Sequence, residues 1–121
     1  MKLNKIHHVA VICSDYVKSK HFYTDVLGMK IMSENYRKER DSWKADCWLD
    51  DNYVIELFSF PNPPARPSYP EAAGLRHLAF EVDDRMQLMN LTVKASLMSL
   101  YARMNILTSD LYSSVIQMVC R

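Results

Sequence analysis

The chain has 121 residues, of which 49% are hydrophobic and 24% charged, and its formal net charge is +1. This length supports one small domain with a single core, and the near-neutral charge gives no electrostatic basis for binding nucleic acid or an anionic membrane. No apolar run approaches the roughly 20 residues that span a bilayer, and the start of the chain lacks the long apolar stretch of a signal peptide, so we expect a cytoplasmic protein.

The first sixty residues predict the order β-α-β-β-β. Residues 5–13, KIHHVAVIC, are a β-branched run typical of a strand. Ser14-Asp15 is a good N-cap for the following helix, which carries apolar residues at three-to-four spacing and ends before the C-cap residue Gly28. Three further strands are predicted over residues 29–36, 42–49 and 53–60.

The rest of the chain begins a second unit and then loses its pattern. Residues 61–74 hold all five prolines and one of the two glycines, which predicts an extended connector. Residues 75–82, LRHLAFEV, predict a strand, and a helix should follow Asp83-Asp84 if the unit is duplicated. Residues 85–121 contain no glycine, no proline and one acidic residue, so the turns of a further β-α-β-β-β unit are missing.

The three cysteines, Cys13, Cys47 and Cys120, are odd in number and far apart. This spacing argues against a disulfide framework or a thiolate zinc site. We expect each cysteine to be a small buried apolar residue.

Alternation along the strands places one metal-ligand type on an otherwise mainly apolar face of three strands. These residues are a histidine of the first strand (His7 or His8, which the pattern alone does not separate), Glu56 and His77. An ionised carboxylate on such a face is costly unless it is paired or bound to a metal. Two imidazoles and a carboxylate would suit a divalent transition metal. The alternatives are hydrogen-bonded structural histidines and an ion pair of Glu56 with Arg76 or a lysine.

Four motifs in this order, HHVAV, FYTDVLGMK, YVIELF and GLRHLAFEV, resemble the glyoxalase / vicinal oxygen chelate superfamily. The stretch RPSYPEAAGLRHLAFEV is similar to its small bacterial lactoylglutathione-lyase-like members. The resemblance implies an α+β fold of paired βαβββ modules curled around a divalent metal. It covers about residues 3–84, so we divide the chain into a family-like region, 1–84, and an aberrant tail, 85–121.

The resemblance implies that His8, Glu56 and His77 are the metal ligands, with nickel or zinc expected first and manganese or iron also accepted. Family members usually have a fourth ligand, a glutamate on the last strand in a phrase like D-P-D-G-L-P-L-E-L, and this phrase is absent here. Glu56 is then the candidate catalytic carboxylate as well. Ile12 and Phe60 stand where glutathione-using members carry arginine and asparagine, so the resemblance does not extend to glutathione.

By the same resemblance we expect a metal-dependent lyase or isomerase of the lactoylglutathione lyase type. Its substrate would be a small molecule that chelates the metal through neighbouring oxygens, and its partner a second copy in a homodimer. No nucleic-acid or membrane partner is expected. Two alternatives stay open: a metal-free small-molecule-binding module of the antibiotic-resistance type, and an extradiol dioxygenase-like enzyme.

The loss of pattern after Asp84 has a specific explanation. When the tail is reverse-translated and read from the third base of each codon, Ser114 to Arg121 permits Phe-x-Asp-Pro-Asp-Gly-Leu-Pro. Residues 99–106 permit Pro-Ile-Arg-x-Asp-Glu-Tyr in the same frame. Both phrases are expected of the family at these places. We therefore hypothesise that a one-base slip near Asp84-Arg85 replaced the end of the second module, which predicts an unstable or aggregation-prone chain with an incomplete metal site.

Overall fold

The computed structural model describes residues 1–64, 73–84 and 116–120 and, between the last two ranges, residues 86, 87, 89–91, 93, 94 and 96. Two compact units make up the chain, Met1–Ala65 and Arg66–Arg121. Within the described residues, no helix is both long enough and apolar enough to cross a membrane.

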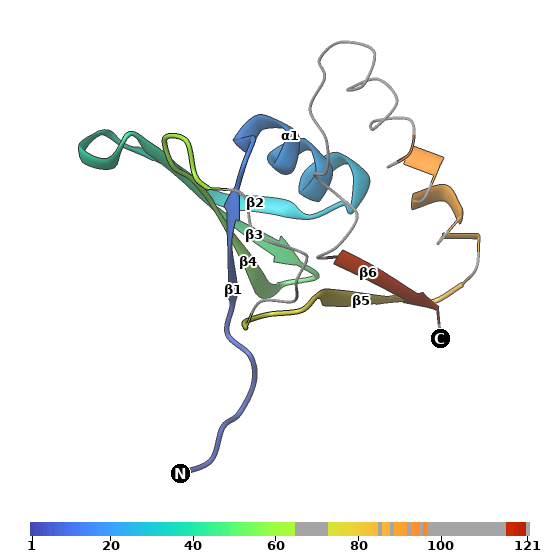
Figure 1. Ribbon diagram of the computed structural model, residues 1–121. Coiled ribbons are helices and arrows are strands. Elements are labelled where there is room, and N and C mark those ends of the chain that lie inside the picture. Colours follow the sequence, from blue (N-terminus) through green and yellow to red (C-terminus); the bar gives the residue numbers. More distant parts are fainter. Residues whose placement is uncertain are drawn as a thin grey trace. The chain divides into compact units, whose positions relative to one another are not determined.

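The first unit is built on a four-stranded sheet with the strand order β1-β4-β3-β2 (Figure 1). Its strands are β1 (Val9–Cys13), β2 (Lys30–Arg37), β3 (Ser42–Leu49) and β4 (Asn52–Ser59). β1 runs parallel to β4, with Val9 opposite Ile55, whereas β3 is antiparallel to both β2 and β4. Together with the helix after β1, this arrangement confirms the predicted β-α-β-β-β order.

The helical segment begins where the sequence predicts. The Asp15 side chain caps α1 (Tyr16–His21) by accepting a hydrogen bond from the Lys18 backbone N–H at 3.1 Å. The segment then widens into the π-helical turn η1 (Phe22–Val26). Gly28 follows at a φ of 75°, the left-handed conformation that ends many helices.

The core of the first unit lies between the helical segment and one face of the sheet. From the sheet, the side chains of Ala45, Cys47, Ile55 and Leu57 are completely buried. From the helical segment and the residue after Gly28, the buried side chains are Phe22, Tyr23, Val26 and Met29. The buried positions in β3 and β4 alternate with half-buried ones, as expected of strands with only one face in the core.

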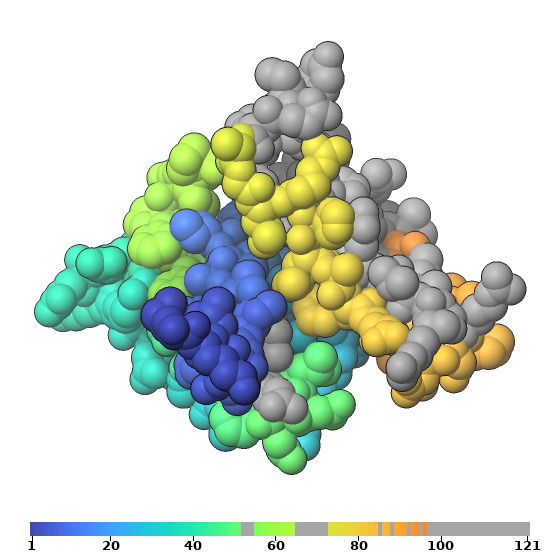
Figure 2. Space-filling view, turned by 90° about the horizontal axis from the view of Figure 1, so that it is seen from below, coloured from blue at the N-terminus to red at the C-terminus, as the bar shows by residue number. Residues whose placement is uncertain are grey.

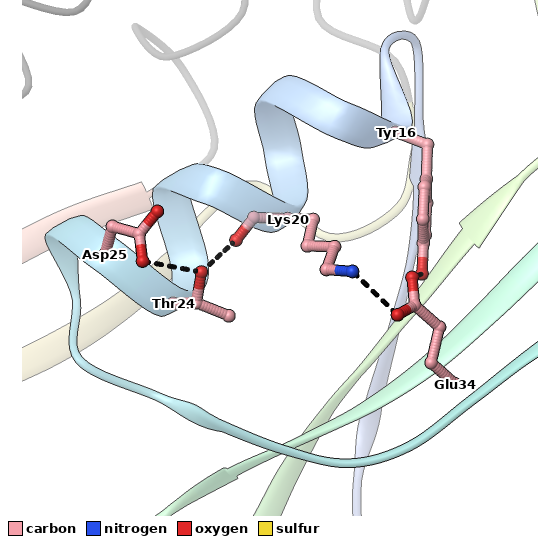
Figure 3. Close-up of polar contacts among 5 residues, drawn as sticks. All are labelled: Tyr16, Lys20, Thr24, Asp25 and Glu34. Atoms are coloured by element: carbon pink, nitrogen blue, oxygen red, sulfur yellow. Dashed lines mark hydrogen bonds and ion pairs between the residues drawn. The ribbon is translucent and has the colours of Figure 1, made fainter.

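Polar contacts to Glu34 of β2 hold α1 against the edge of the sheet (Figure 3). The Tyr16 hydroxyl donates to Glu34 Oε1 at 2.8 Å, and Lys20 Nζ donates to Glu34 Oε2 at 2.6 Å. The hydrogen bond from Lys20 lowers the pKa of Glu34, and the bond from Tyr16 adds to this effect, although burial opposes it. The carboxylate therefore stays ionised and joins the helix to the strand.

Two predicted strands are shorter than the sequence analysis expected. Residues 1–8 have no regular secondary structure and extend away from the sheet as an exposed segment (Figures 1 and 2), so the prediction of a strand from residue 5 was wrong for its first half. Among the described strands β1 lies at an edge and pairs with β4 alone, and β4 begins at Asn52, after the turn from β3. Few residues of β4 therefore remain to pair with the residues before Val9.

The second unit contains β5 (Leu78–Val82) and β6 (Ile116–Cys120), which pair in parallel with Leu78 opposite Ile116. β5 begins three residues later than predicted, which leaves His77 outside the strand. The described residues between 86 and 96 are helical, and the Gln87 N–H donates to Asp84 Oδ1 at 2.8 Å, so a helix follows Asp83-Asp84 as expected. The second βαβββ module is incomplete. Residues 97–115 of the tail lie outside the described residues.

Candidate metal and substrate site

The sheet of the first unit has a second face, opposite to the one that packs against α1, and we call it the open face. Cross-strand register arranges its side chains in rows. One row contains Ala10, Glu56, Asp46 and Ser33, and the next contains Ile12, Phe58, Lys44 and Asn35. The open face therefore carries several charged groups, whereas the helix-facing side is almost entirely apolar.

His8 and Glu56 meet at one end of the open face. His8 Nε2 lies 3.8 Å from Glu56 Oε2, with 43% of the His8 side chain and 16% of the Glu56 side chain exposed. Glu56 is held by the centre of β4, which pairs with a strand on each side. His8 lies just before β1 and completes the pair from the exposed N-terminal segment.

Lys44 of β3 is a third charged member of this site. Its Nζ lies 2.7 Å from Glu56 Oε1 and 2.9 Å from Asp46 Oδ1. The hydrogen bonds to Glu56 and Asp46 raise the pKa of Lys44, so the ammonium stays charged between the two carboxylates. Pairing of Glu56 with a lysine was one of the alternatives left by the sequence, and the structure contains this pair.

Asp46 completes the polar row. Ser33 Oγ donates to Asp46 Oδ2 at 2.5 Å, while the other oxygen faces Lys44. Burial by itself would raise the pKa of Asp46, but the hydrogen bonds from Ser33 and Lys44 outweigh it and lower the pKa. Lys44 and Asp46 were not among the residues predicted for the site. A signal was present, because both charges alternate with the apolar residues Trp43, Ala45 and Cys47 in β3.

The His8–Glu56 pair has the chemistry and nearly the spacing of two ligands of one metal ion. Two ligand atoms about 2.1 Å from a tetrahedral metal lie about 3.4 Å apart, so a small side-chain rotation would bring the pair to this spacing. The third expected ligand, His77, belongs to the second unit and is exposed just before β5. In the part of the chain that the structure describes, no group of three or more His, Cys, Asp and Glu side chains could hold a metal ion.

Comparison with known proteins identifies the family. The family model of the Glyoxalase/Bleomycin resistance protein/Dioxygenase superfamily matches residues 5–91. The chain belongs to this superfamily. The match ends close to residue 84, where the sequence analysis expected the tail to depart from the family.

This chain is similar to one relative in sequence and to another in both sequence and fold. The chain is 63% identical over 82 residues to "Uncharacterized protein YaeR" of Escherichia coli (strain K12), a match that covers 68% of this chain and 64% of that protein. The chain therefore spans less than two thirds of this relative's length. The crystal structure of a glyoxalase family protein from Enterococcus faecalis is 41% identical, with a TM-score of 0.70, and the match covers 79% of this chain and 75% of that chain.

The same fold occurs in a more distant protein. A mutant of the fosfomycin resistance protein FosX from Listeria monocytogenes, solved as a complex with Mn(II), is 13% identical. Its TM-score is 0.63, and the match covers 81% of this chain and 71% of that chain. This likeness is one of fold alone.

Proposed function

We propose that this superfamily member derives from a metal-dependent lyase or isomerase of the lactoylglutathione lyase type. Its substrate would be a small molecule that binds the metal through neighbouring oxygens. The observation that carries the proposal is the His8–Glu56 pair, 3.8 Å apart on the open face. A half-buried carboxylate beside an imidazole is a donor set that divalent transition metals accept.

In this proposal His8, Glu56 and His77 hold the metal. Nickel or zinc is expected first, and manganese or iron would also be accepted. When bound, the metal supplies a Lewis acid that polarises substrate oxygens. Glu56 is proposed to take up and return the substrate proton as a general base. Lys44, on Glu56 Oε1, would orient this carboxylate while its other oxygen faces His8.

The last-strand glutamate of the family is missing from this chain, so the proposed site has three protein ligands and is incomplete. A homodimer is proposed from the family resemblance. Because the chain spans only part of its curated relative, the activity of a complete protein belongs to this proposal as well.

Metal analysis of the purified protein tests the proposal. After incubation with nickel or zinc and gel filtration, we expect up to one metal ion per chain. His8→Ala and Glu56→Ala should each reduce the bound metal at least tenfold. His21→Ala is the matched control, because His21 is an exposed histidine that pairs with Asp25 on the helical segment. Equal metal content in all four proteins would refute the proposed site.

One observation favours a second candidate, a metal-free module that binds a small molecule. Lys44 already neutralises Glu56 at 2.7 Å, so the carboxylate does not need a metal to offset its charge. This alternative predicts no retained metal and no effect of His8→Ala on ligand binding. Metal content therefore separates the two functions before any substrate is known.

A further inference from the structure

Arg37 of β2 is a further charged group on the open face, beyond the residues proposed for the metal and for catalysis. Its guanidinium carbon lies 4.9 Å from the centre of the Phe58 ring and 5.7 Å from that of Phe60. The two rings stack with their planes 11° apart. Arg37 Nη2 donates to Ser42 Oγ at 2.5 Å, and the Ser42 side chain is completely buried. The guanidinium is thus held in one place by aromatic contacts and an anchored hydroxyl.

The charge of Arg37 has no carboxylate partner within the described part of the chain, and its buried Nε has no hydrogen-bond partner there. Lys44 differs, because Glu56 and Asp46 compensate its charge. Arginine carries five N–H donors in a planar fork that matches two oxygens of a carboxylate or phosphate. Within the described part of the chain, Arg37 is therefore a cation of this face whose N–H donors are only partly used.

Arg37 contacts a residue close to Glu56, the carboxylate proposed to react with the substrate. Phe58, which the guanidinium contacts, is two residues from Glu56 in β4, or about 7 Å along the strand. Lys44 Nζ lies between them, 2.7 Å from the Glu56 carboxylate and 5.8 Å from the centre of the Phe58 ring. A small molecule could reach from Glu56 to Arg37 without leaving the open face.

We propose that Arg37 binds an oxyanion of the substrate, a carboxylate or phosphate group carried about one row of the sheet away from the oxygens that react at Glu56. Phe58 and Phe60 position the guanidinium, and Lys44 offers its remaining N–H to the same molecule. The substrate class is thereby narrowed to small anionic molecules. This inference rests on the proposed function, because it takes the Glu56 end of the open face as the reacting end.

Anion binding to the metal-free protein tests this inference separately from metal binding. Inorganic phosphate and malonate are titrated at constant ionic strength against sodium chloride, and binding is followed by calorimetry and thermal shift. We expect at least one of the two to bind, and Arg37→Gln to raise its dissociation constant at least tenfold. The preferred anion distinguishes a phosphoryl group from a carboxylate. Arg40→Gln, an exposed arginine on the turn η2 (Lys38–Arg40), should leave binding unchanged.

Arg37→Lys keeps the charge but loses the planar fork, so it should bind the anion several-fold more weakly than the wild type while retaining the fold. If neither anion binds better than chloride, or if Arg37→Lys and Arg37→Gln bind like the wild type, the inference is overturned. Anion binding that depends on Arg37 in a protein that never retains metal would sustain the oxyanion site and refute the metal-dependent function. Metal binding without anion binding would sustain the metal-dependent function and refute the oxyanion site.

Discussion

At the scale of single residues, burial decides the chemistry of the two described thiols. Cys13 and Cys47 face the core with 4% and 0% exposure, which confirms the expectation that they are small buried apolar residues. Burial raises the pKa of Cys47 to about 11 and also raises the pKa of Cys13. Since the thiolate is the reactive form, both groups should be inert in the folded protein.

A thiol reagent at pH 8 checks this. Cys120→Ser removes the cysteine whose side chain is not described, and the remaining two thiols should react at least a hundredfold more slowly in the native protein than in urea. Because the folded protein favours the protonated Cys47 thiol, its contribution to the free energy of unfolding is complete below pH 9 and is lost as the pH rises towards 11. Rapid native modification of two thiols would contradict the described core.

Glu34 gives a prediction with the opposite pH dependence. The Lys20 and Tyr16 hydrogen bonds hold its pKa below the ordinary value of 4.5, so they stabilise the fold above that pH and stop doing so as the pH falls through the lowered pKa. Glu34→Gln should lower the free energy of unfolding by about 1 kcal/mol at pH 7, a value already discounted for partial exposure. Urea denaturation at pH 7 and pH 3 measures this.

The exposed Glu39, on the turn η2, supplies the matched control. Glu39→Gln should have little effect on the urea midpoint at either pH. A Glu34→Gln loss that is the same at pH 3 and pH 7 would show that the ion pair does not stabilise the helix against β2.

The site residues show how far sequence reasoning reaches at this scale. Glu56 was identifiable because a carboxylate among apolar neighbours in a strand is costly. Lys44 left only the weak signal that it alternates with apolar residues in β3, and Arg37 was not identifiable, because lysine and arginine in strands are usually solvated. Their importance depends on register, which places Lys44 opposite Phe58 and brings its Nζ to Glu56. Register follows from pairing across three strands, and the local pattern of one strand does not contain it.

At the scale of elements, the predicted bounds held to within one residue for β2, β3 and β4, the strands joined by antiparallel pairing. β3 spans the predicted residues 42–49, and β4 differs from its predicted range by one residue at each end. The two strands that follow His8 and His77, β1 and β5, each have one neighbour among the described strands, and both begin later than expected. The side-chain pattern did not separate His8 from His7, and it did not contain the partner strand that would keep either residue in β1.

Gly28 tests the end of the helical segment. Its φ of 75° disfavours any side chain, yet a Cβ added there would meet no atom within 4 Å. Gly28→Ala should therefore cost about 1 kcal/mol of unfolding free energy from backbone strain alone. Gly28→Asn should cost less, because asparagine tolerates the left-handed region. Thermal melts of the three proteins decide this, and an equal loss for both substitutions would point to a cause other than φ.

At the scale of the whole molecule, the two units differ in how their sheets are built. The first unit joins β2, β3 and β4 by short antiparallel connections, including the turn at Asp50-Asp51, where both residues have positive φ. Residues 85–121 contain no glycine or proline to favour such turns. A parallel pair such as β5–β6 is joined by a crossover and needs no hairpin. The parallel pairing of β6, the described strand of the tail, is therefore consistent with the composition of the tail and differs from the family pattern.

This difference leads to a prediction about the gene. If a one-base slip near Asp84-Arg85 created the tail, a single-base change near codon 85 should restore the Asp-Pro-Asp-Gly phrase. The restored protein should unfold cooperatively, because its second module regains further strands, and a sheet of only two strands is marginally stable. It should also bind nickel or zinc at least tenfold more tightly than the present chain.

Circular dichroism melts with and without metal compare the two proteins. Metal at 100 times its dissociation constant stabilises a folded protein by about 2.7 kcal/mol, and at 10 times by about 1.4 kcal/mol. A concentration that saturates the restored site should therefore raise the melting temperature of the restored protein by several degrees and that of the present chain by clearly less. His8→Ala in the restored protein should remove the shift, which ties it to the proposed site. The hypothesis fails if no single-base change near codon 85 recovers the phrase. It fails equally if the present chain melts in one sharp transition that metal raises as far as in the restored protein, because an intact site would then exist without the family's last strands.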